Sequence, residues 1–308
     1  MDIIGLLIQK IVQLLLMLLM GYTIVRCKIL RAEDSMVLSK ISLYLIAPCT
    51  IIKAFQIKLN VAVMEGFLYA LAASLVIHIL LIILLKIWKH IFHLNVVETA
   101  SVFYSNAGNL IIPLVAYLFG DEWVIYTSGF ILVQTIFIWT HGVSLFRRST
   151  KIQWKKILLN INLISIVAGL ALMLLRISLP DVMLGTLESV GAMIGPAAMM
   201  ISGMLAADMS MKNIFCSKRT YLIAIMRLVL TPGFILLSVK GLMAMNLIPA
   251  GDMITLIVLL AVMTPSASTI VQLAQIHDCN AQYAGAINIL SIVLCVITMP
   301  AMVYVYLL

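Results

Sequence analysis

One stretch of this chain reads Ser105-Asn106-Ala107-Gly108-Asn109-Leu110-Ile111-Ile112-Pro113 and lies near the middle of an otherwise apolar segment. A proline lacks the backbone donor that a helix interior uses, and a glycine adopts dihedral angles that a helix does not. In the hydrocarbon layer of a membrane, unpaired backbone groups are tolerated only where protein or a water-filled cavity satisfies them. The stretch therefore predicts a membrane helix that is interrupted near the middle of the bilayer.

A second polar break occurs at the corresponding depth later in the chain, where the sequence reads Thr264-Pro265-Ser266-Ala267-Ser268-Thr269. One interpretation is a pair of proline kinks whose polar side chains bond to neighbouring helices. The other is a binding site formed by two discontinuous helices, a feature of secondary transporters. Because the two breaks occur at matching places, we favour the binding site.

The composition requires a membrane environment. Of the 308 residues, 64% are hydrophobic and 10% are charged, and the mean hydropathy is +1.17. A soluble domain of that composition does not have enough polar residues to cover its surface. The apolar residues form continuous runs of about 20, which suit membrane helices and lack the alternation of barrel strands. They predict an all-α membrane protein with ten spans, at residues 4–25, 36–57, 63–86, 97–119, 123–145, 158–176, 187–208, 220–243, 252–276 and 282–306.

The basic residues indicate orientation rather than nucleic-acid binding. The net charge is +8, but the 20 Lys and Arg lie between the apolar runs and form no single basic stripe. Fourteen of them fall in odd-numbered loops and four in even-numbered loops. The positive-inside rule therefore places the odd loops in the cytoplasm and both termini outside.

The two halves of the chain share an order of features. Each half has a proline in its second span, Pro48 and Pro196, and another in its fourth, Pro113 and Pro265. A half with five spans crosses the membrane an odd number of times, so the second half enters it from the opposite side. We therefore predict an inverted repeat of residues 1–148 and 149–308, related by a pseudo-twofold axis in the membrane plane.

The breaks also predict an anion site. Two half-helices are expected to begin near the membrane midplane, after Asn109 and after Thr264. Each helix N-terminus offers unpaired N–H groups and roughly +0.5 of an elementary charge, so the pair provides about one positive charge. Such a site suits a carboxylate without any arginine in it.

At these residues the chain resembles the auxin efflux carrier family, over essentially its whole length. The motifs are Asn106-x-Gly108-Asn109-Leu110-x-x-Pro113-Leu114 and Phe119-Gly120, Arg227-Leu228-x-x-x-Pro232, and Thr264-Pro265 through Ala274 and Asp278 to Thr298-Met299-Pro300. The resemblance implies ten helices with spans 4 and 9 crossing at their prolines. It also implies a scaffold of spans 1, 2, 6 and 7, a transport domain of spans 3–5 and 8–10, and often a homodimer. Substrates of the family are organic anions, which are auxin in plants and dicarboxylates such as malate or malonate in some bacterial members.

The breaks and this likeness together give eight candidate residues for substrate binding: Asn106, Gly108, Asn109, Pro113, Thr264, Pro265, Ser266 and Ser268. Two departures from the family pattern bear on the site. Ile111 stands where the family usually has glycine, which predicts a wider crossing or a smaller pocket. Span 10 reads Leu290-Ser291-Ile292-Val293-Leu294-Cys295 in place of the usual Ser-Thr-x-x-Ser, which predicts fewer polar groups from that span.

Four further residues are candidates for coupling or gating: His78, Arg227, Asp208 and Gln272. His78 is either a structural histidine or a proton-coupling group. Arg227 either snorkels to the membrane surface or pairs with Asp208. No Asp or Glu falls inside the breaks, so we expect no carboxylate proton relay there, while neutral oxygens leave Na⁺ binding open and H⁺ coupling is unresolved. The five cysteines contain no CxxC pair, so neither a metal site nor a cofactor is expected.

Three hypotheses for function follow. The leading one is a permease for a small organic anion, by alternating access, in a bacterial cytoplasmic membrane, with the substrate and the lipid bilayer as its partners. The alternatives are a sodium-coupled symporter of the bile-acid-transporter type and a membrane sensor that kept the fold without transport. The chain has no HExxH or GxSxG motif and no paired aspartates inside its spans, so we do not expect an enzyme.

Overall fold

The computed structural model describes residues 3–56, 61–120, 123–147, 159, 161–208, 216–247 and 252–307. In these ranges the chain is helical, with short 3₁₀ and π-helical segments and no strand. The first half contains α1 (Ile3–Arg26), η1 (Ala32–Asp34), α2 (Ser35–Ile41), η2 (Ser42–Ile46), α3 (Ala47–Ala54), α4 (Val61–Phe92), α5 (Val96–Phe103), α6 (Ala107–Phe119), α7 (Val124–Phe137), η4 (Ile138–Gly142) and α8 (Val143–Arg147). The second half contains α10 (Ile161–Leu174), α11 (Asp181–Gly191), α12 (Ile194–Ala207), α14 (Lys218–Ile225), η5 (Met226–Leu230), α15 (Thr231–Ala244), α16 (Met253–Met263), α17 (Ser268–Ile276) and α18 (Ala281–Leu307).

Six of the described helical stretches are long and apolar enough to cross a membrane: Ala32–Lys53, Val61–Phe92, Val124–Arg147, Asp181–Ala207, Lys218–Ala244 and Ala281–Leu307. Predicted spans 4 and 9 are each divided into two shorter helices, and span 6 is described as a helix only from Ile161 onward. The all-helical membrane architecture is therefore confirmed, whereas the count of ten spans stays a prediction.

Several helices begin where the sequence provides a cap. The Asn95 side chain accepts a bond from the Glu98 N–H (3.0 Å), and the Glu98 carboxylate accepts one from the Asn95 N–H (2.8 Å), which is a capping box at the start of α5. The Asp252 carboxylate accepts bonds from the N–H and hydroxyl of Thr255 (both 2.7 Å) at the start of α16. These local bonds satisfy N–H groups that a helix leaves unpaired in its first turn.

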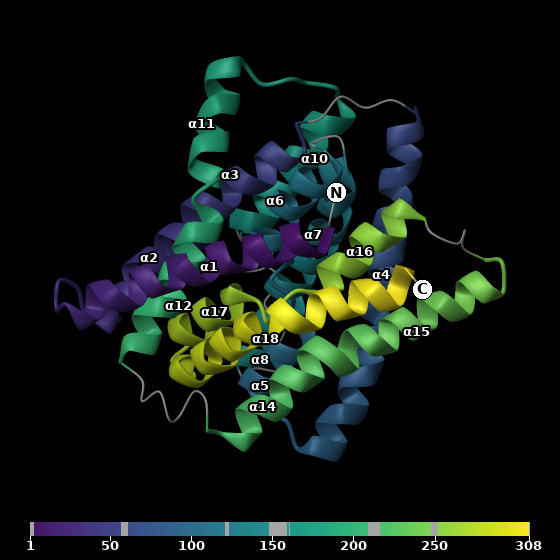
Figure 1. Cartoon of the computed structure of the whole chain (residues 1–308). Coiled ribbons are helices and arrows are strands. Elements are labelled where there is room, and N and C mark those ends of the chain that lie inside the picture. Colours follow the sequence, from purple (N-terminus) through teal and green to yellow (C-terminus); the bar gives the residue numbers. More distant parts are fainter. Residues whose placement is uncertain are drawn as a thin grey trace.

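Helices from distant parts of the chain pack side by side. α1 lies along α12, and α3 packs against both α10 and α11. α4 packs against α7 and α16, while α18 packs against α14 and α17. The long helix α18 also contacts α1 and α12 (Figure 1).

Two glycines allow α1 and α12 to approach closely. A Cβ atom on Gly21 would collide with backbone atoms of Met200, and a Cβ atom on Gly203 would collide with the backbone of Leu18 and Tyr22. Small residues at a membrane helix interface let the two backbones meet and gain packing contacts. The contact between the halves of the chain therefore depends on these two positions.

Gly203→Val is expected to push α1 away from α12 and to lower the melting temperature of the purified protein, with a cost of about 1–3 kcal/mol or more for overpacking. Thermal unfolding in detergent measures the effect. Gly185→Val is the matched control, because a Cβ on Gly185 in α11 meets no atom within 4 Å. Equal melting temperatures for the two variants would contradict the close packing of α1 on α12.

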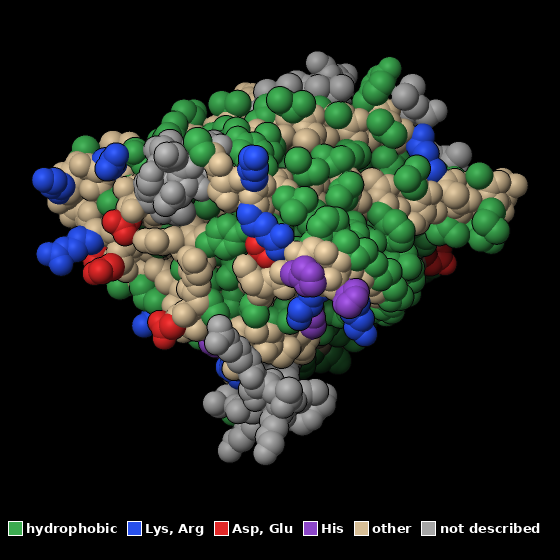
Figure 2. All heavy atoms as spheres, turned by 90° about the horizontal axis from the view of Figure 1, so that it is seen from below, with side chains coloured by type: hydrophobic (Ala, Val, Ile, Leu, Met, Phe, Trp, Pro, Cys, Tyr) green, Lys and Arg blue, Asp and Glu red, His purple; other side chains and the backbone are tan. Residues whose placement is uncertain are grey.

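The outer surface carries apolar side chains at helical spacing. On α4 six of them are each about half exposed: Leu68 (52%), Leu75 (47%), Val76 (53%), Ile79 (47%), Ile83 (54%) and Ile87 (51%). Figure 2 shows one face of the molecule, where hydrophobic side chains cover broad areas and the Lys and Arg side chains lie in small, separate groups. In water such a surface promotes aggregation, whereas in a bilayer it contacts lipid.

Candidate functional site

The two predicted breaks meet in the interior. Ser105 and Ser266 pair as an isolated antiparallel bridge. The Asn106 N–H donates to the Pro265 carbonyl (2.8 Å), and the Ala267 N–H donates to the Tyr104 carbonyl (2.9 Å). Each break therefore satisfies backbone groups of the other, as unpaired backbone at membrane depth requires.

The first break has a second source of hydrogen bonds. Gln134 of α7 accepts from the Ser105 N–H (3.0 Å) and hydroxyl (2.6 Å), and its own amide donates to the Ser105 carbonyl (2.9 Å). Gln134 is 5% exposed. Sequence reasoning missed it, although a glutamine inside an apolar span is itself a signal.

The second break is supported in the same way from α18. The Ser291 hydroxyl accepts from the Ser266 N–H (3.1 Å), and the Asn288 amide donates to the Ser266 carbonyl (2.7 Å). Asn288 also accepts from the Ser202 hydroxyl of α12 (2.9 Å). Our expectation of fewer polar groups from span 10 concerned the lining of the substrate site and stays a prediction. The backbone support from Asn288 was overlooked, because only the family's serine and threonine positions were compared.

One of the two half-helices begins earlier than predicted. α6 begins at Ala107, before Asn109, and α17 begins at Ser268, four residues after Thr264. α6 is helical through position 113, so the first break does not lie at a proline. The helices stop where Ser105 bridges to Ser266, and this pairing is a tertiary contact that local sequence does not reveal.

A cavity of about 110 Å³ lies beside the crossing of the two breaks. Its lining includes Asn106 and Gly108 at the start of α6, and Thr269 and Gln272 on α17. The rest comes from the first break itself, through Ser105, and from η2, α3, α7, η4 and α12, and includes the polar Ser42, Thr50, Gln134 and Thr135 and the apolar Ile51, Ile131, Ile138, Trp139 and Ile194. None of the described residues that line it is Asp, Glu, Lys, Arg or His.

The eight candidate binding residues divide into three groups. Asn106 and Gly108 line the cavity. Thr264, Pro265, Ser266 and Ser268 belong to the second break or the start of α17 and are not among its described lining. The side chains of Asn109 and Pro113 lie outside the described part of the structure. Ile111 is completely buried in α6 and is likewise not among the described cavity residues, so it does not narrow the cavity directly.

A model of one protein family, described as membrane transport protein and corresponding to the auxin efflux carriers, matches residues 6–153 and 143–303. The chain belongs to the auxin efflux carrier family. These two segments cover nearly the whole chain, and a search of curated proteins found no match. Because the family is one of membrane transporters, this member is an integral membrane protein that acts as a transporter or permease.

Arg227 of this family member does not pair with Asp208. Its side chain is fully buried, and its guanidinium donates to the carbonyls of Val102 (3.1 Å), Val262 (2.6 Å) and Thr264 (3.0 and 3.2 Å). Asp208 is exposed at the end of α12 and accepts from the Gln282 side chain (3.2 Å). Neither alternative for Arg227 holds: its guanidinium binds carbonyls at the crossing, which no sequence pattern reveals, and neither reaches the membrane surface nor pairs with Asp208.

His78 lies among aromatic rings rather than in the cavity. Its Nδ1 is 2.7 Å from the Ser74 carbonyl, and its ring lies 5.0 Å from Phe130, 5.2 Å from Phe137 and 5.9 Å from Phe103. The residue is 1% exposed and is not among the described cavity residues. This environment favours a structural role over proton coupling.

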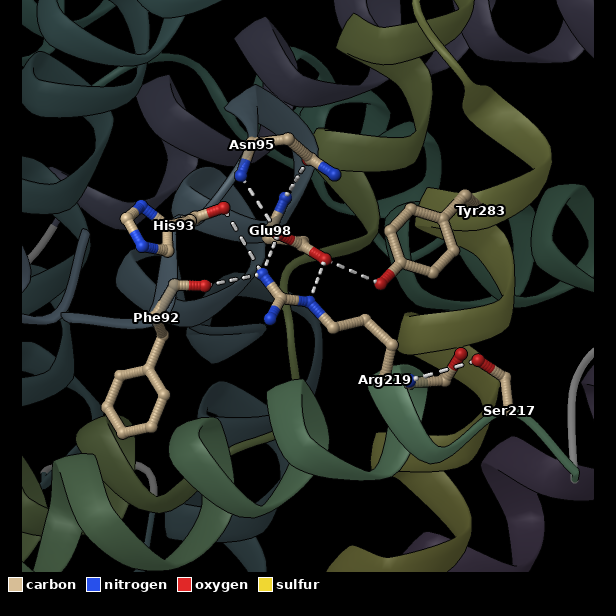
Figure 3. A network of polar contacts seen from close by, with 8 residues as sticks. Phe92, His93, Asn95, Glu98, Ser217, Arg219 and Tyr283 are labelled. Atoms are coloured by element: carbon tan, nitrogen blue, oxygen red, sulfur yellow. Dashed lines mark hydrogen bonds and ion pairs between the residues drawn. The ribbon is translucent and has the colours of Figure 1, made fainter. Parts of the chain in front are cut away.

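A polar network joins the ends of several helices of the transporter (Figure 3). The Glu98 carboxylate accepts two bonds from Arg219 (2.7 and 2.8 Å) and one from the Tyr283 hydroxyl (2.9 Å), and Arg219 also donates to the Phe92 carbonyl (2.9 Å). The Glu98 side chain is 3% exposed. The network connects α4, α5, α14 and α18, so these helices are held together at this end of the molecule.

Proposed function

We propose that this member of the auxin efflux carrier family carries a small organic anion, of the carboxylate class, by alternating access around the crossing. The observation that carries the proposal is the cavity, which is lined by the first turns of two half-helices, α6 and α17, and by no charged side chain among its described residues. Two helix N-termini together provide about one positive charge, and this amount suits one carboxylate.

The neutral lining supports an organic anion over an inorganic one. The side-chain amides of Asn106 and Gln272 are suited to orient a carboxylate by donating hydrogen bonds to it. Trp139, Ile131 and Ile51 offer an apolar wall for the carbon body of the ligand. Ligand sites commonly combine such apolar walls with a few convergent polar groups.

We further propose ten spans in two inverted halves, residues 1–148 and 149–308. Corresponding devices in the two halves support this architecture. Each half contains one break, and an amide residue on the following long helix, Gln134 or Asn288, bonds the backbone of the central serine. In each half an irregular segment also precedes the proline of the second span: η2 precedes Pro48, and the turn at Ala192–Met193 precedes Pro196.

The proposed moving boundary lies between a scaffold of spans 1, 2, 6 and 7 and a transport domain of the other six. The cavity is lined from both sides of this boundary, by η2, α3 and α12 and by α6, α7 and α17. The contact beside it is polar: Gln275 bonds the hydroxyls of Ser35 and Ser39 (both 2.9 Å), and the Gln272 amide lies 3.4 Å from the Ser42 hydroxyl. The hydroxyls of Ser35, Ser39 and Ser42 lie on one helix face at intervals of four and three residues. If α17 slides along this face, its glutamines can exchange one hydroxyl partner for the next.

We also propose that the protein lies in a bacterial cytoplasmic membrane, with both termini outside, as a homodimer. The loop charges support this orientation, and the family likeness supports the homodimer. The neutral oxygens of the cavity leave coupling to Na⁺ or to H⁺ open.

Reconstitution in liposomes tests the proposal. We expect saturable uptake of radiolabelled mono- or dicarboxylates that persists when choline replaces Na⁺, and a higher melting temperature in the presence of the transported anion. Loss of uptake in choline would instead favour the sodium-coupled alternative. A raised melting temperature without flux would favour a sensor, and the absence of both binding and flux across the carboxylate panel would contradict an organic-anion carrier.

A further inference from the structure

Arg227 contacts both broken helices but does not line the cavity. It lies in η5, and its side chain is 0% exposed. Four of its five N–H groups donate to carbonyls: one to Val102, one to Val262 and two to Thr264. In the described part of the chain, no carboxylate oxygen lies within 4.0 Å of its guanidinium. A fully buried arginine in a membrane protein without an ion pair needs another source of compensation.

The compensation comes from the ends of two helices. Val102 lies in the last turn of α5, while Val262 lies in the last turn of α16 and Thr264 follows it. The last four carbonyls of a helix have no partner within the helix, and together with the aligned peptide dipoles they give its C-terminus roughly −0.5 of an elementary charge. Two such ends therefore carry about one negative charge, which the guanidinium balances.

The same crossing brings opposite helix ends close together. α5 ends at Phe103 and α6 begins at Ala107, while α16 ends at Met263 and α17 begins at Ser268. The negative ends of α5 and α16 are thus only a few residues from the positive ends of α6 and α17, which line the cavity. Without a balancing cation, these negative ends would cancel much of the attraction that the positive ends exert on an anion.

We propose that Arg227 is a positioning residue of the anion site, which neutralises the C-termini of α5 and α16 so that the N-termini of α6 and α17 attract an anion unopposed. The inference rests on the proposed anion site, and it assigns to Arg227 a role that requires no contact with substrate. The role depends on charge, whereas a merely structural role depends on the hydrogen bonds to the carbonyls.

A cysteine in the cavity reports the local potential without any transported substrate. Gly108 lines the cavity, and a Cβ atom added there meets no heavy atom within 4 Å, so Gly108→Cys is expected to fold. Iodoacetate and iodoacetamide have almost the same size and alkylate the same thiolate, but only iodoacetate is an anion. The ratio of their alkylation rates therefore measures the preference of the cavity for an anion, and the accessibility and reactivity of the thiol cancel from it.

The ratio of the two alkylation rates is measured in membrane vesicles for Gly108→Cys alone and for Gly108→Cys combined with Arg227→Gln or Arg227→Lys. Alkylation of the chain that keeps Gly108 is subtracted as the contribution of the native cysteines. We expect the iodoacetate preference to fall about tenfold with Arg227→Gln, the order of effect of removing one unit charge from a poorly screened interior. With Arg227→Lys, which keeps the charge but loses the planar set of donors, the ratio should stay within about threefold of its starting value.

Three results would overturn the proposal. The first is a folded Arg227→Gln protein that keeps the iodoacetate preference, because Arg227 then has no electrostatic role at the cavity. If Arg227→Lys lowers the ratio of alkylation rates as much as Arg227→Gln does, the effect comes from hydrogen-bond geometry and not from charge. If Arg227→Gln does not fold, the ratio of Arg227→Lys is compared directly with that of the chain that keeps Arg227, and a fall of about tenfold overturns the proposal in the same way. The third is an equal fall in the ratio at a thiol introduced by Gly233→Cys, which lies on α15 with no atom within 4 Å of its Cβ, because the effect would then not be specific to the cavity. Because no substrate is used, failure of carboxylate transport in liposomes and failure of this test are separate outcomes.

Discussion

Gly108→Leu is expected to reduce transport to background while the protein still folds. Gly108 is the second residue of α6 and lines the cavity, and a Cβ atom there meets no heavy atom within 4 Å. A leucine side chain therefore extends into a cavity of about 110 Å³ and leaves little room for a ligand. Replacing a helical glycine also favours the helix by up to about 1 kcal/mol, so the melting temperature should not fall. Liposome flux and thermal unfolding of the same preparation measure the two effects.

The matched control for this prediction is Gly233→Leu. Gly233 is also a helical glycine with no atom within 4 Å of an added Cβ, but it lies on α15 and is not among the described residues of the cavity. We expect this variant to transport at the parental rate. Gly108→Ala should give an intermediate result, with weaker substrate affinity. Full transport by Gly108→Leu would mean that the substrate does not pass through this cavity.

Gln134→Leu is expected to have the largest effect on stability. The glutamine bonds both the N–H and the carbonyl of Ser105, so a leucine leaves two buried backbone groups without these partners. An unsatisfied buried group costs about 1–3 kcal/mol, which gives roughly 2–6 kcal/mol for the pair. We expect a large drop in the melting temperature in detergent and a loss of transport, because the first break no longer holds its conformation.

Gln282→Leu is the control for Gln134→Leu. Gln282 lies at the start of α18, is exposed, and donates to the exposed Asp208 (3.2 Å). Exposed polar groups that lose a partner bond to water instead, so the melting temperature should change little. If the two variants had equal stability, the bonds of Gln134 to the first break would not be a main support of the crossing.

The existence of the breaks could be predicted from the sequence, but their limits could not. Clusters of Ser, Asn, Gly and Pro in apolar spans identified both interruptions, because such residues weaken a helix wherever they occur. The predicted start after Asn109 was wrong, since α6 begins at Ala107, whereas α17 does begin after Thr264, at Ser268. Local propensity does not reveal that Ser105 pairs with Ser266, and this pairing sets the helix ends.

The partners of the polar residues also depended on tertiary structure. Gln134 and Asn288 are single amides in apolar helices, and the sequence alone does not say which backbone groups they bond. For Arg227 the sequence left two alternatives, snorkelling to the membrane surface and a pair with Asp208. The structure instead provides three carbonyls from two helices that lie far apart in the sequence, so no pairwise charge rule identifies the contact.

The stretch from Ser105 to Pro113 by itself determined that a membrane helix is interrupted, and the rest of the chain determined that the protein is helical and lies in a bilayer. These properties follow from residue chemistry and from hydrophobic runs, which act locally or by composition. Only the tertiary structure decided that the two interruptions bond to each other, that amides from α7 and α18 support them, and that Arg227 lies against two helix ends. Those contacts join residues more than twenty positions apart and depend on how the helices pack.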